Sequence, residues 1–300
     1  MTKTASKQPS PVKNYGPDPT RPGFFGKLAL TIKSVGKIIL QSYKCTFAYT
    51  STSAIKDNRL IILGNGPSLN DTIANNLEQL LTAPTMAVNF AANSPEFAKL
   101  KPRYYVLADP HFFASVNDSN VALLRKNLAS VDWKMTLFLP FTARNSDLAN
   151  GLTNITIEYY NAIGAEGFDW FTRLAYNARR ALPRPRNVLI PAIMIGIWMG
   201  FREIYVTGAD HSWMKTISVD DGNNVVSVQP HFYKEDNKEK ERVRKDYMKY
   251  PLHQIVYSFF LAFRSYHDIQ KYASTRGVEI YNATPDSFID AFPRRPLYEP

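Results

Sequence analysis

The chain has 300 residues, 45% of them apolar, which is enough for one large α/β domain or two small ones and excludes disorder throughout. Its formal net charge is +10, but nine Lys or Arg and one acid lie in residues 1–56, so the nearly neutral remainder argues against nucleic acid as a partner. One cysteine excludes an internal disulfide and a Cys-cluster metal site, and no apolar run reaches the length of a transmembrane helix.

The N-terminal part divides into a leader and a basic segment. Residues 1–23 are rich in Pro, Ser, Thr and Lys without an apolar period, which predicts a disordered leader. Residues 24–56 contain an amphipathic helix with one apolar and one basic face. The apolar face has Leu28, Ile32, Val35, Ile39 and Tyr43, and the opposite face has Lys33, Lys37, Gln41 and Lys44. The pattern predicts that residues 24–47 bind an anionic membrane, and the alternative is a helix packed on the core with a solvated basic face.

The segment RLIILGNGPSLN, at residues 59–70, is a short apolar run that stops at two glycines and a proline. The run predicts a strand covered on both faces, as in a parallel sheet. Gly64 and Gly66 permit backbone angles and close approaches that side chains forbid, and Ser68 or Asn70 can cap the helix that follows. Such a turn offers backbone N–H groups to a phosphate. The alternative is a plain strand-to-helix turn with two glycines.

Polar residues also follow the next two predicted strands. Asn89 ends the strand at residues 85–89, and Asp109 follows the strand at residues 104–108. Ligands of open parallel sheets bind outside the carboxyl ends of the strands, so these residues and the Gly-rich turn are expected to converge on one crevice. Asn and Asp are also ordinary turn formers, and that alternative stays open.

The rest of the chain continues the alternation of helix and strand. Helices are predicted at residues 121–130, 168–180 and 187–199, and strands at residues 135–139, 155–159, 203–207 and 278–282. In the helix predicted at residues 187–199, Ala192 and Gly196 allow tight packing on the sheet. The strand at residues 203–207 ends in small and polar residues, namely Gly208, Asp210 and His211. These elements predict an α/β fold with a doubly wound, mostly parallel Rossmann-like sheet over residues 57–300.

A polar insertion and a long helix follow. Residues 218–241 mix acidic and basic residues with few aliphatic ones, which predicts a mobile lid over about residues 214–250. Pro251 then opens an aromatic helix that Gly277 ends. His253 lies in its first turn and is a candidate general base, because histidine has the side-chain pKa nearest neutrality. The alternative is a structural histidine.

Several common catalytic motifs are missing. No DxD pair stands at a strand end, which argues against a metal-dependent nucleotide-diphosphate sugar transferase. There is no GxSxG, no HExxH and no Walker lysine. We therefore expect neither a metal nor a cofactor.

Three motifs resemble the bacterial sialyltransferases of glycosyltransferase family 42: GNGPSL at residues 64–69, MGFREIYVTGAD at 199–210 and YPLH at 250–253. The resemblance implies that the Gly-rich turn and polar residues after the next strands contact a CMP-sugar, and that the histidine of the YxxH motif is the catalytic base. With the strand-end residues, the expected donor site comprises Gly64, Asn65, Gly66, Pro67, Ser68, Asn89, Asp109, Asn187, Gly208, Asp210 and His211. The expected catalytic residues are His253 and Tyr250. The family has Asn where Asp109 stands, and a Thr-Ser pair where Asn187 and Val188 stand.

A second resemblance, of LKPRYYVLADP at residues 100–110, is to the MptE-like family, which includes pterin pyrophosphokinases and the central domain of motility accessory factors. Three hypotheses follow. The first is an inverting transferase that moves an acidic sugar (a sialic acid, another nonulosonic acid or Kdo) from CMP to a bacterial surface glycan or glycolipid. The second is a Mg-dependent pyrophosphokinase that uses Asp109 and Asp210. The third is a non-catalytic, membrane-associated scaffold.

The first hypothesis carries further expectations. It implies a cytoplasmic protein, peripheral on the inner face of the bacterial inner membrane, with no nucleic-acid partner, and it leaves a homo-oligomer open. His231 and His211 are the other candidates for the base.

Overall fold

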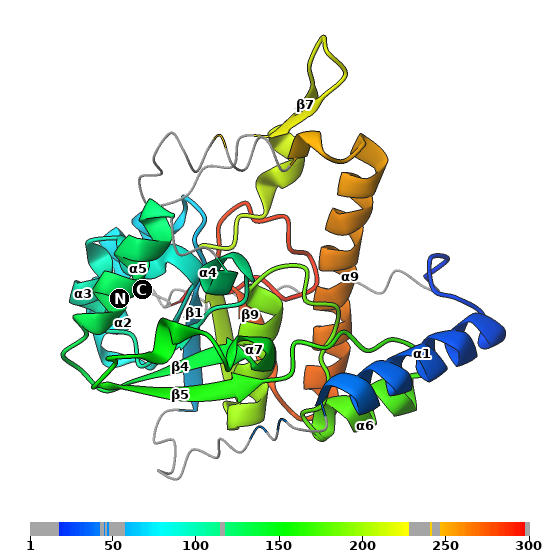
Figure 1. The fold of residues 1–300 in the computed structure, drawn as a ribbon, viewed down its shortest axis with the longest axis horizontal. Coiled ribbons are helices and arrows are strands. Elements are labelled where there is room, and N and C mark those ends of the chain that lie inside the picture. Colours follow the sequence, from blue (N-terminus) through cyan, green and yellow to red (C-terminus); the bar gives the residue numbers. More distant parts are fainter. Residues whose placement is uncertain are drawn as a thin grey trace, which may run out of the picture.

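The computed structural model describes residues 18–42, 45, 47, 58–114, 118–227, 241 and 247–297. At its centre is a seven-stranded sheet in the order β5-β4-β3-β2-β1-β6-β9, in which every neighbouring pair is parallel (Figure 1). The strands are β1 (Arg59–Leu63), β2 (Thr85–Val88), β3 (Tyr104–Val106), β4 (Met135–Pro140), β5 (Ile155–Tyr160), β6 (Glu203–Thr207) and β9 (Glu279–Asn282). The predicted α/β fold with a doubly wound sheet is confirmed.

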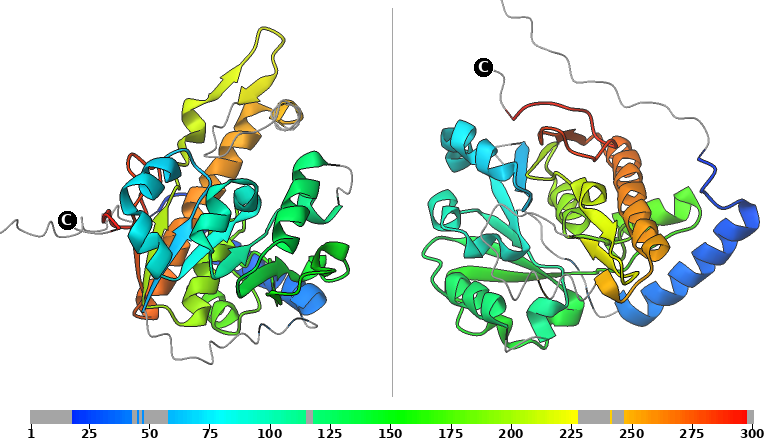
Figure 2. Two further views of the ribbon diagram at one scale, coloured as in Figure 1. Left: turned by 90° about the vertical axis from the view of Figure 1, so that its left-hand side faces the viewer. Right: turned by 90° about the horizontal axis from the view of Figure 1, so that it is seen from above.

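Helices cover both faces of this sheet (Figure 2). They are α1 (Phe24–Ser42), α2 (Leu69–Thr82), α3 (Glu96–Leu100), α4 (His111–Ala114), α5 (Ser119–Ala129), α6 (Asp169–Asn177), α7 (Leu189–Met199) and α9 (Leu252–Thr275). Side chains of α2, α3 and α5 pack on one face, and side chains of α6, α7 and α9 pack on the other. The short helices α3 and α4 were not predicted, because one turn of helix leaves no periodic pattern.

Strand β1 shows why its sequence is a continuous apolar run. Leu60 and Ile62 belong to the core on the α7 side, whereas Ile61 and Leu63 belong to the core beneath α2. Successive side chains of a strand point to opposite faces, so a strand covered by helices on both sides needs apolar residues at every position.

Helix α7 is buried along its whole length. A Cβ atom on Gly196 would lie 2.9 Å from Leu60 Cδ2 and 3.1 Å from Ile204 Cδ1, so the glycine lets the helix approach β1 and β6 closely. Gly200, with φ of 97°, ends the helix in the left-handed conformation. The predicted tight packing of this helix on the sheet is confirmed for Gly196.

The N-terminal residues differ from the prediction. Residues 1–17 of the expected disordered leader lie outside the described residues, but residues 18–23 form a turn that is tied to α9 by an ion pair of 2.5 Å between Arg21 Nη2 and Asp268 Oδ1. The leader therefore does not extend to residue 23 as predicted, because a partner distant in sequence orders its end. None of the helices in the described ranges combines the length and apolar character needed to cross a bilayer.

The predicted lid begins with regular structure. Strands β7 (Ile217–Val219) and β8 (Val225–Ser227) form an antiparallel hairpin that projects from the body near the start of α9 (Figures 1 and 2). At its base, Val225 packs with Ile255 and Phe259 of α9. Residues 228–240 and 242–246, which make up about half of the predicted lid, lie outside the described residues.

Helix α5 begins at a capping carboxylate, which leads to a prediction on stability. Asp118 Oδ1 accepts hydrogen bonds from the backbone N–H groups of Asn120 (2.8 Å) and Val121 (3.0 Å). Burial by itself raises the pKa of Asp118, but the hydrogen bonds from Val121, the His111 ring and Asn120 outweigh it and lower the pKa below its ordinary value of 3.8. The native state therefore favours the carboxylate.

Asp118→Ala is expected to lower the free energy of unfolding by about 1 kcal/mol at pH 7. Because the pKa is lower in the folded state, this stabilisation is present above pH 3.8 and is lost as the pH falls through the folded-state value. Urea denaturation of both proteins between pH 7 and pH 3 should show the difference shrinking in acid. A difference that stays constant with pH would contradict a role for the charge of the cap.

Candidate functional site

The order of the strands reverses between β1 and β6, since β2 follows on one side of β1 and β6 lies on the other. At the carboxyl ends of these strands is a cavity of about 220 Å³, where open α/β sheets bind their ligands. It is lined by Asn65, Gly66, Pro67, Val88, Asn89, Asn187, Val188, Leu189, Gly208, Asp210, His211, Ser212, Trp213 and Thr216. The structure thus brings together most of the residues predicted for a donor site.

The two glycines of the turn after β1 serve contacts between backbones. Gly64 N–H donates to Thr207 O at 2.7 Å, and Gly66 N–H donates to Gly208 O at 2.8 Å. A Cβ atom on Gly64 would lie 2.4 Å from Gly208 O. The prediction that this turn offers its N–H groups to a phosphate is wrong for both glycines, because the turn after β6 already accepts their hydrogen bonds.

Ser68 does not cap a helix with its side chain, as the sequence suggested. It occupies the N-cap position of α2, but its hydroxyl accepts no hydrogen bond from the N–H groups of the helix. Instead, the hydroxyl donates to Asp210 Oδ2 at 2.8 Å. A partner far along the chain thus replaces the local one. The bond ties the turn after β1 to the turn after β6 and orients the carboxylate of Asp210 at the wall of the cavity.

Two asparagines bring polar atoms without hydrogen-bond partners to this cavity. Asn89 begins its turn with φ of 47°, and its Oδ1 is buried without a donor among the described residues. Asn187 Oδ1 accepts from Leu189 N–H at 3.0 Å and from Tyr266 OH at 2.9 Å, which leaves its buried Nδ2 without an acceptor there. Buried polar groups are normally paired, so an unpaired acceptor and an unpaired donor on two residues of the same lining favour a polar ligand there, reached by small side-chain shifts.

His211 is held in one tautomer by a chain of hydrogen bonds. Its Nε2 lies 2.6 Å from Tyr266 OH, and that hydroxyl donates its only proton to Asn187 Oδ1. Nε2 must therefore carry the hydrogen that it donates to Tyr266, and Nδ1 carries an unprotonated lone pair. Burial lowers the pKa of His211 to about 3, so the ring is neutral at pH 7 and is a weak base in the free protein. A negative charge beside the ring, such as the phosphate of a bound nucleotide, would raise this pKa and make the ring a better proton acceptor.

The ring and the backbone of His211 are both closely constrained. Its ring packs on Trp213, with centroids 4.2 Å apart, and its backbone has φ of 51°. Such a conformation is uncommon outside glycine and is frequent at functional sites. Tyr266 was missed in the sequence because it is one of many aromatic residues on α9, and no local pattern connects it with His211.

The predicted catalytic pair lies outside this cavity. His253 is exposed on the first turn of α9, and Tyr250 precedes the helix with 54% of its surface exposed. Tyr250 lines a second cavity of about 550 Å³, together with Arg186, Tyr247, Gln254, Ile255, Tyr257, Ser258 and Phe259. The two cavities adjoin, because Trp213 of the first packs on Phe259 of the second with ring centroids 5.2 Å apart. His231 lies outside the described residues.

Asp109 is also separate from the cavity. It is exposed, and its Oδ1 accepts the backbone N–H of His111 at 2.9 Å, at the start of α4. Asp210 alone contributes a carboxylate to the described lining of the cavity. The described residues contain no group of three or more His, Cys, Asp or Glu side chains placed to hold a metal ion.

The comparisons with known proteins find no family, but they do find a structural likeness at low sequence identity. No family model and no curated protein matches this sequence. Among solved structures, the chain is similar to the MAf glycosyltransferase from Magnetospirillum magneticum AMB-1, with 12% identity and a TM-score of 0.48. The match covers 91% of this chain and 38% of that protein, so this chain spans well under half of its length. The function proposed below rests on the residues of the crevice.

Proposed function

We propose that the protein is an inverting glycosyltransferase that uses a CMP-activated acidic sugar as donor and a glycan or glycolipid as acceptor. The observation that carries the proposal is the cavity between β1 and β6, which is lined by His211 and by two asparagines, Asn89 and Asn187, that each have a buried polar atom without a partner among the described residues. A nucleotide and a sugar offer both donors and acceptors to such amides. The carboxylate of Asp210 suits hydroxyl groups of a ribose or a sugar better than a phosphate.

In this reaction an acceptor oxygen forms a bond to the anomeric carbon of the sugar, the bond from that carbon to the phosphate oxygen breaks, and CMP departs with the bonding electrons. The proton of the acceptor hydroxyl moves to Nδ1 of His211. Its Nε2–H stays hydrogen-bonded to Tyr266, which stabilises the ring as it becomes positive. The amide Nδ2 of Asn187 is a donor for the departing phosphate.

The second cavity is the place for the acceptor. Three tyrosines and Arg186 line it, and aromatic rings with hydroxyl groups provide apolar faces and polar edges for a sugar chain. The two cavities adjoin where Trp213 packs on Phe259, so an acceptor bound in the second cavity lies next to a donor bound in the first. In this arrangement Tyr250 binds the acceptor and takes no part in proton transfer.

A pyrophosphokinase has less support from the geometry. A triphosphate and its Mg²⁺ need several charged groups converging on one place. Asp109 and Asp210 were the carboxylates expected for the metal, and only Asp210 lines the cavity. No Lys or Arg occurs among the lining residues that the structure describes there.

The donor site is tested by replacing Asn89 with glycine. Glycine accepts the left-handed backbone at this position, so the change removes the amide without strain. We expect CMP to raise the melting temperature of the wild-type protein more than AMP, GMP or UMP do, and we expect Asn89→Gly to raise the Kd for CMP about tenfold in calorimetric titration.

The matched control is Asn223→Gly in the β7–β8 hairpin, where an asparagine also has a positive φ, of 61°, but does not line the cavity. It should bind CMP like the wild type. Equal shifts with all four nucleotides, or an unchanged CMP affinity in Asn89→Gly, would overturn the assignment of the donor site.

A further inference from the structure

Helix α1 lies on the body in the reverse of the usual orientation for an amphipathic helix. Its buried side chains are the small polar residues Thr31, Ser34 and Ser42. Most of its large apolar side chains are exposed, among them Phe25 (83%), Ile32 (65%) and Leu40 (76%), whereas Leu30 and Ile38 are half-buried. The alternative that the apolar face packs on the core is therefore wrong. Surface helices normally bury their apolar face, so this exposure needs a partner.

Specific polar contacts hold α1 in this orientation. Ser34 Oγ donates to Glu166 O at 2.9 Å, and Thr31 Oγ1 accepts Phe168 N–H at 3.1 Å. A Cβ atom on Gly167 would lie 2.0 Å from Thr31 Oγ1, so the helix is seated closely on the segment before α6. These bonds are formed by the side of α1 that faces the body, and the ion pair between Arg21, just before α1, and Asp268 adds a contact to α9.

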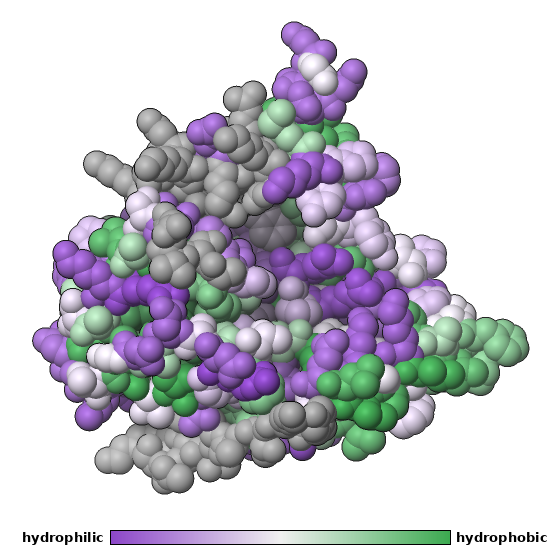
Figure 3. All heavy atoms as spheres, viewed as in Figure 1, coloured by the Kyte–Doolittle hydropathy of each residue, from purple (hydrophilic) through white to green (hydrophobic). Residues whose placement is uncertain are grey.

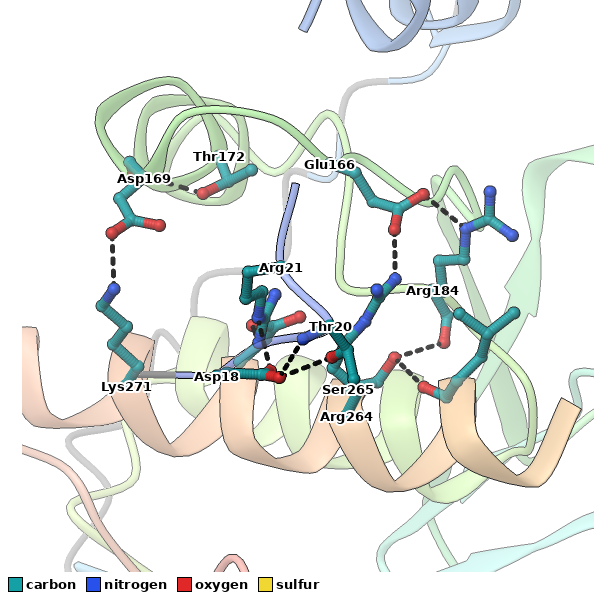
Figure 4. A network of polar contacts seen from close by, with 12 residues as sticks. Asp18, Thr20, Arg21, Glu166, Asp169, Thr172, Arg184, Arg264, Ser265 and Lys271 are labelled. Atoms are coloured by element: carbon teal, nitrogen blue, oxygen red, sulfur yellow. Dashed lines mark hydrogen bonds and ion pairs between the residues drawn. The ribbon is translucent and has the colours of Figure 1, made fainter. Parts of the chain in front are cut away.

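Figure 4 shows that the body beneath α1 is a polar network. Glu166 is bound by Arg184 Nε at 2.6 Å and by Arg264, and Lys271 on α9 pairs with Asp169 at 2.5 Å. Glu166, Asp169, Arg264 and Lys271 line a cavity of about 500 Å³ between α1, α6 and α9. An apolar helix face packed against these charged side chains would remove them from water, which costs free energy. This cost explains why the apolar face of α1 points outward.

Helix α6 extends the exposed apolar face of α1. Trp170 and Leu174, one turn apart on α6, are exposed by 59% and 61%. The two helices lie side by side (Figure 1), and Phe24 of α1 contacts Phe168 just before α6 with ring centroids 5.3 Å apart. Figure 3 shows a broad hydrophobic area over these two helices. We call it the α1–α6 surface, formed by Phe24, Phe25, Leu28, Ile32, Ile39, Leu40, Trp170 and Leu174.

Positive charge borders this surface. Lys33 and Lys37 lie on α1, which contains no acidic residue, and the exposed Arg173 lies between Trp170 and Leu174 in the sequence of α6. The carboxylate at the start of α6, Asp169, is already paired with Lys271. An apolar ridge with flanking cations and little negative charge complements the acyl chains and anionic headgroups of a lipid bilayer.

We propose that the α1–α6 surface binds the interface of an anionic membrane, with both helices inserting apolar side chains and Trp170 at the level of the headgroups. A second copy of the chain fits this surface less well. A two-fold contact would place the basic borders of two α1 helices against each other, and α1 has no acid to pair with them. The α1–α6 surface is distinct from the nucleotide cavity, so membrane binding can be tested independently of glycosyl transfer.

The test uses the full chain and sedimentation with vesicles of phosphatidylcholine, alone or mixed with phosphatidylglycerol. Ile32→Glu places a charge on α1, and Leu174→Glu places one on α6. Both side chains are more than half exposed, so the fold is expected to be preserved. Leu123→Glu on α5, which is 41% exposed outside this surface, is the matched control.

We expect wild type and Leu123→Glu to bind the anionic vesicles, more weakly at about 1 M salt than at about 0.1 M, and each of the other two variants to partition at least about tenfold less. CMP binding should be the same in all four proteins. Normal binding by Leu174→Glu would overturn the joint surface. Equal binding of all four proteins, combined with a wild-type dimer in solution that Ile32→Glu dissociates, would show instead an interface between copies.

Discussion

Replacing His211 with glutamine is expected to lower the kcat for release of CMP from a CMP-activated acidic sugar by about a hundredfold or more, which is typical of removing a general base. Glutamine can still donate a hydrogen bond to Tyr266 from its amide, but it has no basic nitrogen in place of Nδ1. CMP affinity should stay near that of the wild type. The measurement is initial rates with CMP-sialic acid and CMP-Kdo, beside calorimetric titration with CMP.

His253→Gln is the control for this experiment, since His253 is the base that the sequence resemblance implies. It is exposed on the first turn of α9 and lies outside the cavity lining, so its loss should lower kcat only slightly. The opposite outcome, an inactive His253→Gln and an active His211→Gln, would restore the assignment from the YxxH motif. His211 would then be a structural residue of the crevice.

The Tyr266 hydroxyl is expected to act through His211. Tyr266→Phe removes the acceptor of the Nε2–H and leaves the ring free to choose its tautomer. A purely structural role would change stability alone. If Tyr266 positions the base, the variant should also have a lower kcat with little change in KM, and the substitution should add little in a His211→Gln background.

Gly64→Ala should cause a large loss of stability. A methyl group there would lie 2.4 Å from the carbonyl oxygen of Gly208 and 2.8 Å from its carbonyl carbon. These are backbone atoms at the ends of two paired strands, so they can yield only if β1 and β6 separate. We expect a loss of about 3 kcal/mol or more in the free energy of unfolding, together with weaker CMP binding.

Gly36→Ala is the matched control for that substitution. Gly36 lies within α1, and a Cβ atom on it would have no neighbour within 4 Å, so alanine should be neutral or stabilise the helix slightly. Chemical denaturation of the two variants and the wild type gives the comparison. A Gly64→Ala protein as stable as Gly36→Ala would mean that the turns after β1 and β6 are further apart than the structure shows.

The sequence alone predicted the strands and the fact that both of their faces are buried. A run such as LIIL at residues 60–63 or IYV at 204–206 is apolar at every position, and in a run this short that composition indicates a strand buried on both faces. Because parallel strands end at the same edge of a sheet, the residues after β1, β2 and β6 could be assigned to one crevice without coordinates. The exception is Asp109, which follows β3 as predicted but is exposed and caps a short helix.

The partners within the crevice depended on the tertiary structure. The N–H groups of Gly64 and Gly66 bind carbonyls more than a hundred residues away, so a turn that looks open to an anion in the sequence is closed by β6. The hydrogen bonds from His211 through Tyr266 to Asn187 join three segments that no spacing rule connects. Local patterns record which positions are buried, but a hydrogen-bond partner is decided by which distant segments the fold places within about 3 Å.

The N-terminal helix shows the same division between sequence and tertiary structure. Its amphipathic period and its lack of acids were evident from the sequence, and they predicted a helix with one apolar and one basic face. The period cannot indicate which face meets the protein, because both arrangements have the same spacing. The polar segment around Glu166 and the ion pair of Arg21 with Asp268 decided it, since a charged, hydrogen-bonded surface pairs with Thr31 and Ser34 and leaves the apolar side chains outside.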